Sequence, residues 1–444
     1  MRPLKLLYLA LFFSLPLSVE NFSLGFGINV PSEPFQGFIA VALLFYIKPL
    51  LDLCKTLCRN PLFIAIAAYI GWSWISCLYS GLPVVSAKYT LIETLHVLVF
   101  VAGLALVEKH ERGFWIKCVL AYTTCFIPLL LHGLYLHAQY NFAIDFSAAA
   151  MRPFYRDHPL YGVVLAFLIP LWAYFLIQKN NPLDILNNRR LSGIVTLLLL
   201  VGLIFSFSRA AWLTTVIGAM AAVSLFYAKQ HLKQLLAVGA IGLFILIPVG
   251  VFVGLNVQKK EVVKNTTVGN QLLSSFNWTH DVANLERLNR YKCAWRMFKD
   301  KPLTGFGNNM YKFTYLNYQK KEEMTRISLS DALPEARKGT GGNSHSDYLA
   351  ALTELGLPGF IFWCTIVFFA LFYSCRLYVK DSRPEFQFIF CALLTYFIHV
   401  LVNNFIHDDK ISALVWMCCA VILIAKTSEI GKTTQPTKMN PVRP

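Results

Sequence analysis

Apolar runs of about 20 residues recur along most of the chain and are separated by short polar segments. Because backbone polar groups inside a bilayer must be hydrogen-bonded within the protein, such runs predict membrane-spanning α-helices. The predicted spans are residues 4–19, 35–53, 61–79, 88–107, 114–137, 158–177, 191–207, 209–228, 232–255, 357–376, 386–405 and 410–426. The pattern indicates an all-α polytopic membrane protein with about 12 transmembrane helices.

One long polar stretch interrupts this pattern. We therefore divide the chain into residues 1–255 with nine spans, a large loop at 256–345, residues 346–427 with three spans, and a tail at 428–444. Within the loop, apolar residues at spacings of three or four over 280–300 predict a helix, which Pro302 ends. Residues 320–343 are polar and contain glycine, which is equally typical of a lid and of a plain linker.

Basic residues in the short loops predict the orientation of the chain. Most of them fall on the side of the two termini, and the short loops opposite contain only Lys88, Arg152, Arg156, Arg209 and Lys410. Lys-rich and Arg-rich short loops remain in the cytoplasm. Both termini are therefore predicted to be cytoplasmic, and the large loop is predicted to lie outside.

Composition excludes a soluble protein and narrows the partners. The 444 residues are 56% hydrophobic and 14% charged, against about 25% charged in soluble domains. The net charge of +16 predicts anionic partners. With this hydropathy, membrane lipids and phosphorylated lipids fit better than nucleic acid. Of the 11 cysteines only Cys293 lies in a long polar segment, so no disulfide framework is predicted.

The stretch 339–360 contains the strongest candidate chemistry. A glycine-rich turn leads into Ser344, and Asp347 follows three residues later, a spacing that predicts a helix start. His345 would then lie in the first helical turn, where the helix dipole disfavours a charged imidazole. A neutral His345 can act as a general base, and the same helix end suits a phosphate.

Three arginines add candidate phosphate ligands. Arg209 lies between two spans with almost no loop, either as an interfacial anchor beside Trp212 or as a phosphate ligand. Arg287 and Arg290, three residues apart, project from one flank of the helix predicted at 280–300.

Two further polar clusters lie in outside loops. The first contains Arg152, Arg156, Asp157 and His158, and the second contains Asn403, Asn404, His407, Asp408 and Asp409. Metal binding by the second cluster is conceivable, but it lacks the usual ligand spacing, so we predict no metal site. Motifs for nucleotide binding are also absent from the sequence, and no cofactor is predicted.

Three motifs in this order resemble a known family. They are Phe207-Ser208-Arg209-Ala210-Ala211-Trp212, then Arg287 with Ala294 and Asp300-Lys301-Pro302-Leu303-Thr304-Gly305-Phe306-Gly307, then His345-Ser346-Asp347-Tyr348-Leu349 with Glu354-Leu355-Gly356-Leu357-Pro358-Gly359. Together they resemble the O-antigen ligase/polymerase superfamily of membrane glycan transferases, whose members have about a dozen helices and one large periplasmic loop. Ser346 departs from the family's commoner asparagine, and Tyr291 from its frequent tryptophan.

The resemblance implies an activity and a location. The protein would transfer a glycan from undecaprenyl pyrophosphate to a hydroxyl of lipid A–core, at the periplasmic face of the bacterial inner membrane. Extension of a growing lipid-linked glycan by a polymerase, or protein O-glycosylation, fits the same motifs. A transporter of lipid-linked glycans is the non-enzymatic alternative, and it predicts inverted repeats that the sequence lacks.

The resemblance also suggests roles for residues. His345 would be the general base, and Arg287 and Arg209 would stabilise the pyrophosphate leaving group in an inverting reaction that needs no metal. The predicted substrate-binding residues are Arg290, Arg156, His158, Asn343 and Ser346.

Overall fold

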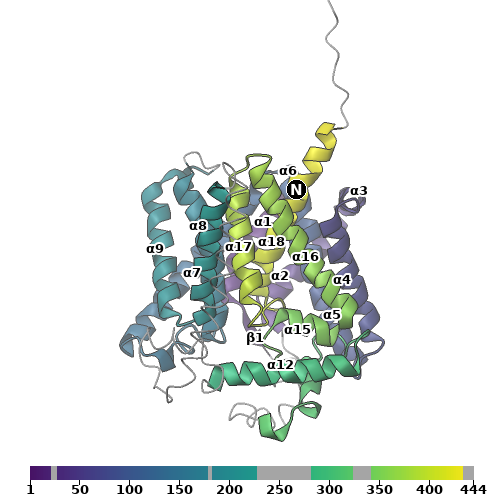
Figure 1. The fold of residues 1–444 in the computed structure, drawn as a ribbon. Coiled ribbons are helices and arrows are strands. Elements are labelled where there is room, and N and C mark those ends of the chain that lie inside the picture. Colours follow the sequence, from purple (N-terminus) through teal and green to yellow (C-terminus); the bar gives the residue numbers. More distant parts are fainter. Residues whose placement is uncertain (22–27, 179–182, 228–281, 324–341, 434–444) are drawn as a thin grey trace, which may run out of the picture.

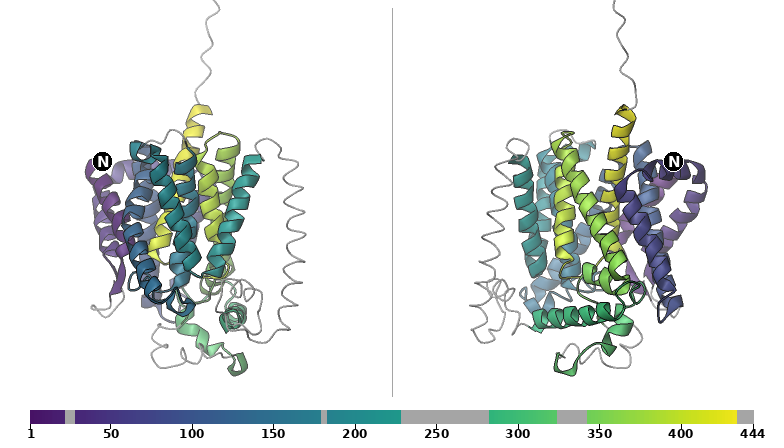
Figure 2. Two further views of the ribbon diagram at one scale, coloured as in Figure 1. Left: turned by 90° about the vertical axis from the view of Figure 1, so that its left-hand side faces the viewer. Right: turned by 45° about the vertical axis from the view of Figure 1, so that its right-hand side comes forward.

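The computed structural model describes residues 1–21, 28–178, 183–227, 282–323 and 342–433. In these residues the chain is helical apart from one short hairpin, in which β1 (Val19–Asn21) pairs antiparallel with β2 (Ile28–Val30). Figures 1 and 2 show a bundle of upright helices, with α12 (Val282–Asp300) lying across its lower end. The all-α prediction is confirmed for the described part of the chain.

The bundle is built from helices of very different length. The first are α1 (Arg2–Ser14), η1 (Leu15–Leu17), α2 (Ser32–Leu44), α3 (Ile47–Leu57), α4 (Pro61–Cys77) and the continuous run of α5 (Pro83–Val97), η2 (Leu98–Gly103) and α6 (Leu104–His110). The next are α7 (Phe114–Gln139), η3 (Ile144–Phe146), α8 (His158–Ile177), η4 (Asp184–Asn187), α9 (Arg189–Phe205) and the helix Arg209–Tyr227.

The C-terminal part adds a small helical layer outside the bundle and the last upright helices. After α12 come α13 (Tyr311–Thr314), η5 (Tyr315–Asn317) and η6 (Lys321–Glu323). They are followed by α15 (Asp347–Glu354), α16 (Gly356–Val379), α17 (Glu385–His399) and α18 (Asp409–Thr433). The helix predicted at 280–300 is therefore confirmed.

The number of spans is only partly confirmed. In the described residues, six helices are long and apolar enough to cross a membrane, or seven if the bent pair α2 and α3 forms one span. The span predicted at 35–53 is not straight, because the two helices meet at an angle of 94°. The span predicted at 232–255 lies outside the described residues. Twelve spans remain a prediction.

Helix α18 forms the centre of the bundle. Its sequence is apolar on all sides, as in Leu414, Trp416 and Leu423, and these side chains are fully buried. It contacts α5, α6, α7, α16 and α17. Its C-terminal end and the N-terminus of the chain lie at the upper end of the bundle, whereas α12 and α15 lie at the lower end (Figures 1 and 2). This arrangement separates the two termini from the predicted chemistry.

Candidate functional site

His345 lies just before α15, not within its first turn. The N-cap of α15 is Ser346, whose buried hydroxyl accepts a hydrogen bond from the Leu349 N–H at 3.4 Å. The prediction that Ser344 starts this helix is wrong, because the Asp347 carboxylate bonds to Tyr396 and to the main chain after α17. His345 has a φ of 53°, and its N–H donates to the Asn343 side chain at 3.0 Å.

The surroundings of His345 favour its neutral form. Burial and, to a smaller extent, the nearby guanidinium groups of Arg287, Arg290 and Arg156 together lower the pKa of His345 to about 3, against the opposing effect of Glu286. A neutral imidazole was predicted from the helix dipole, but burial and neighbouring cations are the causes here. His345 is therefore unprotonated at neutral pH, and its ring has a nitrogen lone pair that can accept a hydrogen bond.

Helix α12 holds its two predicted arginines in different ways. Arg287 is partly exposed, and it donates from Nε to the Val402 carbonyl and from Nη1 to Asn284 Oδ1, each at 3.2 Å. Arg290 is 1% exposed and forms an ion pair with Glu286 at 2.8 Å. Its guanidinium group also lies 4.1 Å from the centre of the Tyr315 ring. Arg287 is thus the better placed of the two to meet a ligand.

The buried side of α12 carries a small apolar cluster beside the buried ion pair of Arg290 and Glu286. Cys293, Ala294 and Met297 pack against a cover formed by Phe306, Met310, Tyr311 and Tyr315. Trp295, on another side of the helix, is 50% exposed. Arg290 Nη1 donates to the Gly342 carbonyl at 3.3 Å, so this layer also supports the chain just before His345.

Arg209 begins a helix at a tight junction. Phe207 has a φ of 50°, and Ser208 Oγ accepts from the Ala211 N–H at 3.4 Å as the helix cap. Trp212 Nε1 donates to the Leu203 carbonyl at 2.6 Å, which ties the new helix to the end of α9. This motif therefore builds a sharp turn that presents the partly exposed Arg209.

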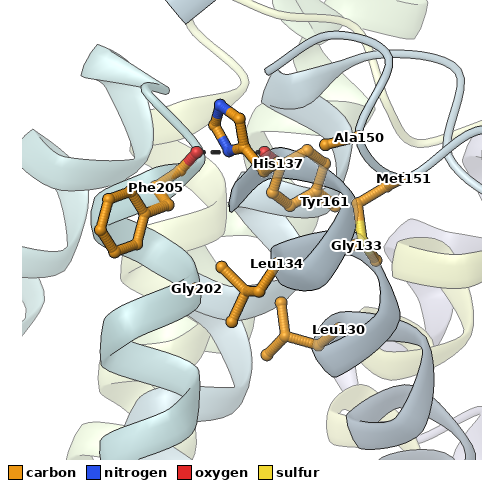
Figure 3. A pocket seen from close by; sticks show the side chains of 9 residues that line it. All are labelled: Leu130, Gly133, Leu134, His137, Ala150, Met151, Tyr161, Gly202 and Phe205. Carbon is orange, nitrogen blue, oxygen red and sulfur yellow. Dashed lines mark hydrogen bonds between the residues drawn. The ribbon is translucent and has the colours of Figure 1, made fainter. Parts of the chain in front are cut away.

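A small apolar cavity lies behind this junction. It is lined by residues of α7, α8 and α9, among them His137, Tyr161 and Phe205, and by Ala150 and Met151 from the segment before α8 (Figure 3). The Tyr161 hydroxyl donates to the Phe205 carbonyl at 3.4 Å. The volume is about 10 Å³, which is at the limit for one water molecule. The cavity is too small for a glycan substrate.

His158 links the junction to α12. Its Nδ1 bonds to the Ser206 carbonyl at 3.0 Å, and it lies within electrostatic range of both Arg209 and Arg287. Arg156, two residues earlier, is exposed and pairs with Asp157 at 3.4 Å. The structure thus brings side chains from three distant motifs to one end of the bundle.

The α17–α18 loop (residues 400–408) joins these parts, a role that was not predicted from the sequence. Its carbonyls at Val400 and Val402 accept from the Asp347 N–H at 3.0 Å and from Arg287. The Tyr291 hydroxyl lies 2.9 Å from the Leu401 carbonyl and 3.3 Å from that of His345. Main-chain groups carry these contacts, so residue types could not reveal them.

Two glycine-containing motifs pack directly against each other. Gly305, with a φ of 66°, lies so close to α15 that a Cβ atom there would be 2.2 Å from the Glu354 carbonyl oxygen. Glu354 in turn accepts from the N–H groups of Asn309 and Tyr311 at 2.9 and 3.0 Å. These motifs therefore fix the C-terminal end of α15 relative to the segment that follows α12. Within the described residues, no group of His, Cys, Asp and Glu side chains is arranged to hold a metal ion.

The fold and this site define a polytopic α-helical membrane protein with a cationic, histidine-containing site at one end of its bundle. Residues 194–364 match the family model Wzy_C, described as O-Antigen ligase. Over these residues the chain therefore carries an O-antigen ligase domain. The match includes Arg209, Arg287 and His345. No curated protein matches the chain.

Proposed function

We propose that this protein transfers a glycan from undecaprenyl pyrophosphate to a sugar hydroxyl of lipid A–core, at the periplasmic face of the bacterial inner membrane. The observation that carries the proposal is the convergence of cations on a neutral histidine. Arg287 lies within electrostatic range of both His345 and His158, and Arg209 lies within range of His158. The matched family supports a lipid-linked glycan as the substrate.

In the proposed reaction His345 is the general base. It accepts the proton of the acceptor hydroxyl, and the resulting oxygen attacks the anomeric carbon of the donor sugar. The bond from that carbon to the pyrophosphate oxygen breaks, and its electron pair leaves with the pyrophosphate. Attack from the side opposite the leaving group inverts the anomeric centre. The energy is already present in the phosphosugar bond, so the step needs neither a nucleotide nor a metal.

The arginines stabilise the charge that develops on the leaving group. Arg287 and Arg209 provide planar forks that match phosphate oxygens and remain charged at every relevant pH. Fixed cations at this position stabilise the transition state without reorganisation of solvent. Arg156 is exposed on the same side and would bind the pyrophosphate as it enters.

The remaining predicted site residues support this arrangement. Arg290 is paired with Glu286, and we assign it to holding the chain before His345 rather than to direct contact with substrate. Asn343 holds the His345 main chain, Ser346 caps α15, and His158 holds the Arg209 junction. Each of them would position a group that contacts the donor.

The experiment that tests the proposal is complementation of a deletion strain. The strain carries the wild-type gene, His345→Ala, Arg287→Ala or the control Arg296→Gln, and its surface glycan and membrane-bound protein are measured. Arg296 is on the same helix, but it binds Glu323 and the Tyr318 carbonyl instead of the site. We expect both alanine variants to lose transfer while the protein remains in the membrane, and the control to retain transfer.

The glycans of the deletion strain identify the acceptor. Loss of long glycan from lipid A–core, with lipid-linked polymer accumulating, is expected for a ligase. Core capped by a single repeat would indicate a polymerase, and loss of glycan from proteins would indicate a protein O-oligosaccharyltransferase. Full surface glycan in His345→Ala or Arg287→Ala would contradict the proposed roles.

A further inference from the structure

The α17–α18 loop contacts both halves of the candidate site through its main chain. Arg287 Nε donates to the Val402 carbonyl at 3.2 Å, and the Tyr291 hydroxyl lies within hydrogen-bond distance of the carbonyls of Leu401 and His345. A shift of this loop would therefore move the guanidinium group and the chain at the histidine together. The loop is in turn held by a side chain of α15.

The Asp347 side chain holds the α17–α18 loop in place. The residue is 2% exposed, and its Oδ2 accepts from the Tyr396 hydroxyl at 2.9 Å. Its Oδ1 accepts from the N–H groups of Phe405 at 2.9 Å and Ile406 at 3.4 Å. Asp347 also donates its own N–H to the Val400 carbonyl at 3.0 Å, so one residue binds both ends of the loop.

We propose that Asp347 is a positioning residue for the glycan transfer, because its carboxyl group fixes the α17–α18 loop and thereby the relative placement of Arg287 and His345. This inference rests on the proposed function. Asp347 lies two positions after His345, and its assigned role is to position groups of the site rather than to bind substrate. It assigns Asp347 to the arrangement of the site, as distinct from the stability of the bundle.

The hydrogen-bond geometry, more than the negative charge, is what the loop requires. Burial raises the pKa of Asp347 to about 7, against the lowering effect of its hydrogen bonds to Tyr396, Phe405 and Ile406. The carboxyl group is therefore partly protonated at neutral pH. An asparagine has a carbonyl oxygen for the two N–H donors and an amide that can donate to the Tyr396 oxygen. Asp347→Asn should consequently preserve the loop.

The test compares Asp347→Ala, Asp347→Asn and Tyr396→Phe in the full-length protein reconstituted in lipid nanodiscs. Hydrogen exchange is followed in peptides that cover residues 400–408. We expect faster exchange of the Phe405 and Ile406 amides in Asp347→Ala, near wild-type exchange in Asp347→Asn, and an intermediate effect in Tyr396→Phe. Tyr396→Phe removes one hydroxyl group without leaving a large cavity, so it remains informative if the alanine variant folds poorly.

Transfer kinetics provide the second readout, with a polyprenyl-pyrophosphate-linked oligosaccharide as donor and lipid A–core as acceptor. We expect kcat to fall on the order of 100-fold in Asp347→Ala, with KM little changed, because a displacement of about 1 Å costs this much in a positioned site. Asp347→Asn should restore most of the loss. A purely structural role would lower the amount of folded protein without changing kcat of the folded fraction.

The matched control is Glu354→Gln. Glu354 is a buried acid on the same helix, but its carboxylate holds Asn309 and Tyr311 instead of the α17–α18 loop. It should leave exchange at 400–408 unchanged. Unchanged exchange in Asp347→Ala, or no recovery of kcat in Asp347→Asn, would overturn the inference. If the wild-type protein transfers no glycan while exchange responds as expected, the proposed function fails and the anchoring of the loop by Asp347 stands.

Discussion

At the scale of single residues, the site combines one base with arginines that differ in what holds them. Arg290 is enclosed by Glu286 and Tyr315, and a buried pair of this kind is costly to break but adds little to ligand binding. Arg287 donates to one main-chain carbonyl and one amide oxygen, both of which are uncharged. Arg287 is also partly exposed, and its positive charge adds to the effect of burial in lowering the pKa of His345.

The pKa of His345 leads to a prediction about pH. Because its pKa is lowered to about 3, the imidazole remains unprotonated as the pH falls from 8 to 5, and His345 should cause no loss of kcat/KM in this range. Burial raises the pKa values of Asp347 and Glu354 to about 7, so these two acids, unlike His345, change protonation within this range. Transfer is measured between pH 5 and 8 in wild type and in Arg156→Gln.

The Arg156→Gln variant helps to identify the group whose titration causes any change of kcat/KM with pH. Arg156 lowers the pKa of His345, so Arg156→Gln must raise it. A change of kcat/KM near pH 6.5 that persists in Asp347→Asn and in Glu354→Gln and moves upward in Arg156→Gln would show that His345 titrates in its ordinary range. That result would contradict the enclosed, cation-flanked environment described above.

At the scale of elements, two motifs far apart in sequence fix the angle between α12 and α15. Gly305 and Gly356 both have positive φ values, 66° and 67°, and each lies against the main chain of the other motif. The Gly307 N–H donates to the Glu354 carbonyl at 2.8 Å, and the Leu357 N–H donates to the Pro302 carbonyl at 2.8 Å. These residues shape the site without taking part in its chemistry.

This contact predicts that alanine is not tolerated at either glycine. A Cβ atom at Gly305 would lie 2.2 Å from the Glu354 oxygen, and one at Gly356 would lie 2.3 Å from the Leu303 oxygen. Left-handed backbone alone costs roughly 1–3 kcal/mol for a residue other than glycine. We expect Gly305→Ala and Gly356→Ala each to lower the free energy of unfolding by at least about this amount.

Thermal unfolding in detergent measures the effect, with Gly71→Ala as the matched control. Gly71 lies within α4, and a Cβ atom there would meet no atom within 4 Å. Alanine favours a helix interior by roughly 1 kcal/mol over glycine, so this control should be neutral or stabilising. Equal melting temperatures for the wild type, Gly305→Ala and Gly356→Ala would contradict the close approach of the two motifs.

Local patterns predicted the helices well where the relevant signals were themselves local. The apolar spacing over 280–300 and the following Pro302 predicted α12, which runs from Val282 to Asp300. The span at 35–53 was predicted as one element, because average hydropathy does not register a bend. The structure divides it into α2 and α3, where Leu50, Leu53 and Leu57 turn into the protein core.

The candidate site was predictable in its residues but not in its connections. Arg287 and His345 stood out because they lie in motifs that resemble the O-antigen ligase family and because their residue types suit phosphate binding and general-base chemistry. The helix start was misplaced because Asp347 bonds to groups after α17, more than 50 residues away in sequence. The role of Val402 was not predictable, since every residue type offers the same main-chain carbonyl group.

At the scale of the whole molecule, the bundle places its termini and its site at opposite ends. The N-terminus, α3 and the C-terminal end of α18 lie at the upper end in Figure 1, and α12 crosses the lower end. Exposed Lys55 on α3 and the pair of Lys5 and Lys117 with Glu111 place several basic residues at the upper end. Short basic segments of this kind remain in the cytoplasm, so α12 should face the periplasm.

Labelling with a membrane-impermeant maleimide tests this orientation in spheroplasts. Cys58, at the end of α3, is exposed and serves as a native reporter of the upper end. Because the upper end is predicted to face the cytoplasm, Cys58 should not react with the maleimide until the membrane is permeabilised. Lys299 is exposed on α12, so Lys299→Cys in a Cys54→Ser/Cys58→Ser background should react in intact spheroplasts, whereas Lys55→Cys in the same background should not. Because α12 carries Arg287, a Lys299→Cys that reacts only after permeabilisation would put the site in the cytoplasm. A periplasmic acceptor such as lipid A–core could not then reach His345, and a different glycan acceptor would be required.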